Sequence, residues 1–119
     1  MSTAEQYIET IKKELAAART AAREGNDGKA RVCSRRAAGT AIEWYVAVYP
    51  GAVKGTDALN RLKNLAEDPT FPKDVREAAQ KLLTRITDRF QYPFSTDPVA
   101  DAALITDYFI RIMDAGASH

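Results

Sequence analysis

The sequence predicts an all-α fold, an antiparallel up-and-down helical bundle of four main helices and one short helix. Apolar residues recur at steps of three and four along most of the 119-residue chain. No segment alternates apolar and polar residues with the period of two that marks a strand. Short turn sequences rich in glycine, proline, asparagine and aspartate separate the periodic segments. We find no repeat and no long linker, so we expect one domain covering residues 1–119.

The first predicted helix is amphipathic and opens with a capping box made of Ser2 and Glu5. Its apolar spacing ends near Gly25, where the polar turn of residues 25–28 begins. Because this turn is short, we expect the second helix to run back antiparallel to the first.

The second predicted helix starts at Asp27, as its N-cap, and ends at about Val48. It is apolar over about half of its circumference, which is typical of a central helix. Residues 37–41 carry only small side chains, so a neighbouring helix can approach closely at Gly39. We expect Trp44 to pack in the core rather than to serve as a stacking platform.

The remaining three helices are bounded by capping residues and prolines. We expect the short third helix between residues 57 and 68, the fourth between 72 and 90, and the fifth between 97 and 115. Thr56 or Asp57 caps the third helix, and Thr96 or Asp97 caps the fifth. Their apolar stripes comprise Leu59, Leu62, Leu65 and Ala66; Val75, Ala79, Leu82, Ile86 and Phe90; and Val99, Ala102, Ala103, Ile105, Phe109, Ile110 and Met113.

Composition narrows the classes of function. The formal net charge is only +1, so overall charge gives no reason to expect a polyanion binder. Cys33 is the only cysteine and His119 the only histidine, and we expect no metal and no cofactor. No phosphate-binding loop, zinc-protease or serine-hydrolase motif occurs, so we expect no enzyme. The lone cysteine and the lack of a signal peptide or membrane span favour a cytoplasmic location.

Basic residues gather at one end of the predicted bundle. Residues 18–36 contain six basic and two acidic residues, whereas the rest of the chain has 11 basic and 14 acidic ones. Such an end can bind RNA phosphates, or it can be a solvated end with internal ion pairs. The absence of interleaved aromatic residues favours the second interpretation. The candidate anion-binding residues are Arg19, Arg23, Arg31, Arg35 and Arg36.

Two of these arginines fall on an apolar helix face. At about 100° per residue, Arg31 and Arg35 lie near Ile42 and Tyr49, and Asp101 lies among apolar residues of the fifth helix. A half-buried carboxylate requires a partner. We therefore predict that Asp101 pairs with Arg31 or Arg35 across the bundle. The pair is either a structural ion pair that fixes register or part of a polar pocket between helices.

Aromatic residues stand beside prolines in two connections, with Phe71 in residues 69–72 and with Tyr92 and Phe94 on either side of Pro93. They can cap the ends of the bundle, which we consider the better interpretation. If they are exposed together, Phe71, Tyr92 and Phe94 form an apolar patch that is a candidate dimer interface.

Residues 25–45 combine a Gly-Asn-Asp-Gly turn with a long helix whose start, residues 29–39, is packed with small and basic side chains. This layout resembles HEPN-type helical domains. The resemblance implies a family of RNA-cleaving toxins and non-catalytic partners of nucleotidyltransferases, whose non-nuclease members commonly dimerise. The ribonuclease branch uses an arginine followed four to six residues later by a histidine. Arg111 stands eight residues before His119, so the resemblance points to a non-nuclease member.

Two main hypotheses of function follow. The first is a non-enzymatic interaction module that binds a protein, or a second copy of the chain, at the basic end or at the aromatic-proline connections. The second is an RNA- or nucleotide-binding domain that uses the basic end, and salt-dependent RNA binding would distinguish it. An enzyme with a polar pocket at Asp101 is a third hypothesis, which requires a second titratable group nearby.

Overall fold

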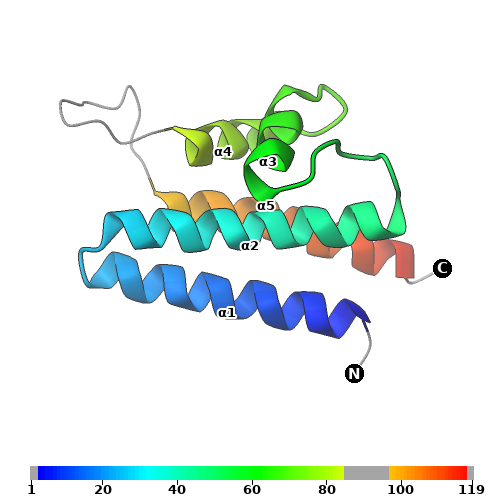
Figure 1. Cartoon of the computed structure of the whole chain (residues 1–119). Helices are drawn as coiled ribbons and strands as arrows, with labels where there is room; N and C mark the ends of the chain where they lie inside the picture. Colours follow the sequence, from blue (N-terminus) through cyan, green and yellow to red (C-terminus); the bar gives the residue numbers. More distant parts are fainter. Residues whose placement is uncertain (1–2, 85–96, 118–119) are drawn as a thin grey trace.

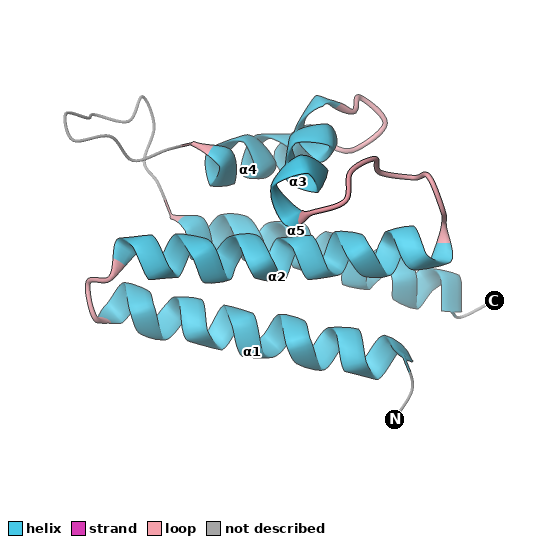
Figure 2. Ribbon diagram, in the orientation of Figure 1, coloured by secondary structure: helices cyan, strands magenta, loops and turns pink. Residues whose placement is uncertain are grey.

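A computed structural model describes residues 3–84 and 97–117, and these residues confirm the all-α bundle (Figure 1). The described part of the chain contains helices and loops but no strand (Figure 2). The helices are α1 (Thr3–Arg23), α2 (Asp27–Val48), α3 (Ala58–Glu67), α4 (Lys73–Leu83) and α5 (Pro98–Ala117).

The central helix is α2, as its wide apolar surface predicts. It packs against α1, α3 and α5, whereas α1 contacts only α2 and α5 among the other helices. Figure 1 shows α1 and α2 as an antiparallel hairpin, with α5 running alongside α2 and with α3 and α4 lying over them. The directions of α1, α2, α4 and α5 alternate along the chain, so the up-and-down order is confirmed, and the short α3 crosses the other helices.

Small side chains allow α1 and α2 to pack closely. The face of α2 with the spacing of Trp44 also carries Ala30, Cys33 and Ala37, all of which are buried. Trp44 belongs to the interior, as expected, and its ring stacks on Tyr7 of α1 with the ring centroids 6.1 Å apart. This face of α2 therefore holds the hairpin together.

On another side of α2, the closest helix approach occurs at Gly39. A Cβ atom placed on Gly39 would stand 2.7 Å from the Cβ of Ala58 and 3.3 Å from its Cα. No side chain larger than hydrogen fits there without a shift of α3. The close approach expected at residues 37–41 is therefore confirmed, and the neighbour is the first turn of α3.

The main core takes side chains from all five helices, and α1 contributes Ile11 and Leu15 to it. Its largest fully buried side chains include Ile42, Leu62, Leu65, Leu82 and Phe109. The apolar stripe of the third helix overreaches at Leu59, which is 52% exposed. Periodicity places a residue on a face, but the length of the neighbouring helix decides whether that face is covered.

The N-cap residues of the described helices agree with the predicted ones except at the start of α2. The N-cap of α2 is Asn26 and not Asp27, because the Asn26 side chain accepts the amide of Lys29 at 3.1 Å. Asp57 caps α3, and the Asp97 carboxylate accepts the amide of Ala100 at 3.0 Å, as expected. The capping box of Ser2 and the alternative cap Thr96 lie outside the described residues.

The fourth helix is shorter than predicted. It ends at Leu83, and Thr84 has extended backbone angles of φ −66° and ψ 128°. At this end the carbonyl of Lys81 accepts the amide of Thr84 at 3.2 Å, and arginines of α2 donate to the carbonyls of Lys81 and Leu82. The continuous helix to residue 90 is therefore wrong at Thr84, and Ile86 and Phe90 lie outside the described residues.

Candidate binding groove

Two arginines of the predicted basic end anchor α4. Arg31 is 6% exposed, and its Nη1 donates to the carbonyl of Lys81 at 2.9 Å. The Nε of Arg35 donates to the carbonyl of Leu82 at 2.6 Å. Cations are favoured at a helix carboxyl end, where the last carbonyls lack helical partners. These two side chains thus have a structural role that competes with anion binding.

Asp101 does not form the predicted ion pair. Among the described residues, no ion pair joins its carboxylate to Arg31 or to Arg35, and each of these arginines donates instead to a carbonyl at the end of α4. Burial raises the pKa of the Asp101 carboxyl above its ordinary value, although the positive charges of Lys81 and Arg31 oppose the shift. Asp101 is therefore half-buried and within electrostatic reach of Arg31 without contacting it.

The other three arginines diverge. Arg19 and Arg23 are exposed on α1, and Arg23 donates to the hydroxyl of Thr20 on the same helix at 3.2 Å. Arg36 lines a hollow farther along α2 together with Thr40. The five candidate anion-binding residues thus divide among the α4 end, the outer face of α1 and this hollow.

The aromatic-proline patch is not formed by Phe71, which belongs to the core. Phe71 is buried, and its ring lies 5.9 Å from Phe109 and 6.2 Å from both Tyr45 and Tyr108, measured between centroids. The burial of Phe71 agrees with the interpretation preferred from the sequence, in which this aromatic residue covers the bundle, and it removes Phe71 from any exposed patch. Tyr92 and Phe94 lie outside the described residues.

The surface between α1, α2 and the start of α3 is hollowed into one groove. A hollow of about 410 Å³ lies beside Gly39, and a second of about 260 Å³ shares Thr40 and Glu43 with it. We call the two together the α1–α2 groove. Its lining consists of Thr3, Gln6, Tyr7, Thr10 and Glu14 of α1, Arg36, Gly39, Thr40 and Glu43 of α2, and Thr56, Asp57, Ala58 and Arg61 of the loop and first turns of α3.

Helix geometry explains why these side chains converge. Arg36, Thr40 and Glu43 follow each other at steps of four and three, so they line one face of α2. The same steps join Tyr7, Thr10 and Glu14 on α1. The contact between Gly39 and Ala58 brings α3 down beside this face and places Arg61 at the groove.

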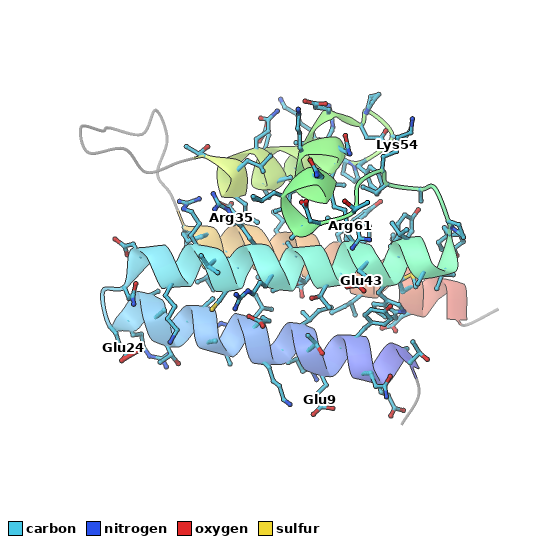
Figure 3. The ribbon with its side chains drawn as sticks, in the orientation of Figure 1. Glu9, Glu24, Arg35, Glu43, Lys54 and Arg61 are labelled. Atoms are coloured by element: carbon cyan, nitrogen blue, oxygen red, sulfur yellow. The ribbon has the colours of Figure 1, made fainter. Side chains whose placement is uncertain are left out.

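The α1–α2 groove holds charges of both signs. Arg36 and Arg61 line it together with Glu14 and Glu43, and no ion pair joins any of these four within the described residues. The Nε of Arg61 is buried without a hydrogen-bond partner. Figure 3 shows Arg61 on α3 above the part of α2 that carries Glu43. Buried donors of this kind are rare in proteins, and the Nε of Arg31 and the hydroxyl of Ser34 are two further examples among the described residues.

Two other polar groups at the groove are already used. The Asp57 carboxylate accepts the backbone amide of Asn60 at 2.9 Å and its side-chain amide at 3.0 Å. The Thr40 hydroxyl donates to the carbonyl of Arg36 at 2.9 Å. The charged side chains of the lining that form no hydrogen bond or ion pair with another described side chain are thus those of Arg36, Arg61, Glu14 and Glu43.

Sequence reasoning found Arg36 but missed Glu14, Glu43 and Arg61. Their spacing on the helices was available as a signal, since Glu43 stands seven residues after Arg36. The side from which α3 approaches is a tertiary feature, however, and no local pattern encodes it. The groove could therefore not be assembled from the sequence alone.

The chemistry of the described residues is limited in other respects. No group of three or more histidine, cysteine, aspartate or glutamate side chains that could hold a metal ion occurs among them. Cys33 is buried. None of the helices in residues 3–84 and 97–117 combines the length and apolar content that crossing a bilayer requires. Compared with family models, curated proteins and solved structures, the chain matches none of them.

Proposed function

We propose that this chain is a non-enzymatic helical interaction module that binds an extended segment of a partner protein in the α1–α2 groove. The observation that carries the proposal is the groove itself, which is lined by two guanidinium groups and three carboxylates without ion pairs among them. Charged side chains that lack internal partners can be satisfied by a partner at little cost in lost internal contacts.

The dimensions of the groove fit a stretch of polypeptide. Thr3 and Glu14 mark its extent along α1, and these eleven steps along a helix correspond to roughly 16 Å. A polyproline II segment advances about 3.1 Å per residue, so about five residues span the groove.

RNA or nucleotide binding, the alternative, has less support. Arg31 and Arg35 are engaged with carbonyls of α4, so they contribute little to a phosphate site. Arg36 lies in a groove that also carries Glu14 and Glu43, which repel phosphate. The proposal agrees with the HEPN resemblance, which points to a non-catalytic member. Dimerisation, which the resemblance implies, and a cytoplasmic location, which the composition favours, remain predictions.

A selection experiment tests the proposed function. A phage library of random peptides, each about eight residues long and hence longer than the groove, is selected against the chain. Enriched peptides are then compared on Thr40→Arg, which places a long side chain where the two hollows meet, and on Ala16→Arg, which adds the same group to an exposed position of α1 outside the groove.

We expect peptides that bind the unmodified chain and Ala16→Arg equally but lose at least tenfold in affinity for Thr40→Arg. Circular dichroism and unfolding midpoints of both variants verify that they fold alike. Enriched peptides that bind all three chains equally, or no enrichment at all, would refute the groove as the binding site. Salt-dependent binding of a single-stranded RNA probe that is lost in Arg19→Glu would favour the alternative instead.

A further inference from the structure

We infer that the α1–α2 groove selects partner segments that carry one acidic and one basic side chain three residues apart. This inference rests on the proposed function and adds the chemistry of the partner to it. It is carried by the order of charges along α2, where Arg36 and Glu43 stand on the same face and both line the larger hollow.

The spacing of these charges sets the spacing on the partner. Seven residues of α2 separate Arg36 from Glu43, which corresponds to roughly 10.5 Å along the helix axis. In a polyproline II segment, residues i and i+3 lie on the same face and about 9.3 Å apart. A segment in this conformation therefore presents a carboxylate to Arg36 and a cation to Glu43 at the same time.

The opposite walls of the groove exclude segments with a single sign of charge. Glu14 on α1 adds a carboxylate to the hollow that contains Arg36, and Arg61 on α3 adds a guanidinium. A purely acidic segment meets Glu14 and Glu43, and a purely basic one meets Arg36 and Arg61. Unfavourable pairs of this kind contribute to specificity as much as favourable ones do.

Arg61 provides a second reason to expect a carboxylate in the partner. It comes from α3 and lines the same hollow as Arg36, so it adds a second positive charge there. A guanidinium binds a carboxylate through a planar fork of donors. The acidic side chain of the partner can thus be shared between two arginines that come from different helices.

Peptides from the selection described above, made synthetically, test the inference by isothermal titration calorimetry. Each peptide is compared with two versions in which glutamine replaces either its acidic residue or its basic residue. The chain is compared with Arg36→Gln and Glu43→Gln, and the matched controls are Arg19→Gln and Glu24→Gln, which neutralise exposed charges outside the groove.

We expect each single change in the peptide to weaken binding at least tenfold. In Arg36→Gln, replacing the acidic peptide residue should have little further effect, because the arginine that pairs with it is already gone. In Glu43→Gln, the same should hold for the basic peptide residue, whose partner carboxylate is missing. The controls should bind like the unmodified chain.

Groove-specific peptides without this charge pair would overturn the inference and leave the proposed function intact. The change Arg36→Gln could also weaken the binding of the original peptide and of the version without its acidic residue by the same factor. The two charges would then be uncoupled, and this result would overturn the inference as well. If no peptide distinguishes Thr40→Arg from Ala16→Arg, the proposed function fails and the inference fails with it.

Discussion

The contact between Gly39 and Ala58 predicts an unusual response to replacement of Gly39 by alanine. Alanine is favoured over glycine in a helix interior by about 1 kcal/mol, so propensity alone predicts a stabilised Gly39→Ala variant. The new Cβ would stand 2.7 Å from the Cβ of Ala58, however, and that atom is not the end of a flexible side chain. Overpacking of this kind typically costs about 1–3 kcal/mol.

The middle of this range is about 2 kcal/mol, and the gain in helix propensity offsets about 1 kcal/mol of it. We therefore expect Gly39→Ala to be less stable than the unmodified chain by about 1 kcal/mol. Urea unfolding followed by the fluorescence of Trp44 measures the free energy of unfolding. The double variant Gly39→Ala with Ala58→Gly should recover most of the loss, because it removes the atom that the new Cβ meets. A Gly39→Ala variant that is more stable by about the propensity value would refute the argument.

Two other predictions concern the arginine and the aspartate near α4. Arg31→Met keeps an apolar stem but leaves the carbonyl of Lys81 without its 2.9 Å donor, so unfolding should become easier by about 1.5–3 kcal/mol, whereas Arg19→Met on the exposed face should change it little. Equal effects of the two changes would contradict the anchoring role. Burial raises the pKa of Asp101, so its ionised form destabilises the fold at neutral pH, and this penalty fades as the pH falls through the raised pKa. Asp101→Asn should therefore have a higher thermal midpoint than the unmodified chain at pH 7 and the same one at pH 3. A lower midpoint at pH 7 would mean that attraction to Lys81 and Arg31 outweighs desolvation.

Local signals predicted the helices well. The caps at Asp57 and Asp97 and the turn at residues 25–28 are short-range chemistry, and the structure uses them near the expected positions. The end of α4 was missed because apolar spacing continues past Leu83. Arginines about fifty residues earlier in the chain donate to the carbonyls at this end, a long-range contact that no local pattern encodes.

The contacts of the candidate site residues were also not predictable from local sequence patterns. The helical wheel placed Arg31 and Arg35 on an inward face, and Arg31 is indeed buried, but the partner turned out to be backbone rather than Asp101. A wheel gives the direction of a side chain and not the identity of what lies there. The α1–α2 groove depends even more on tertiary contacts, since one of its walls is the first turn of α3.

The burial of Cys33 gives the molecule a built-in chemical reporter. Its thiol lies on the face of α2 that holds α1, and the chain has no other cysteine. A thiol reagent therefore modifies the native protein when the helices around Cys33 separate or when the whole bundle unfolds. The labelling rate under native conditions measures how often this part of the bundle opens, and a segment bound in the α1–α2 groove, which contacts both helices, should slow it.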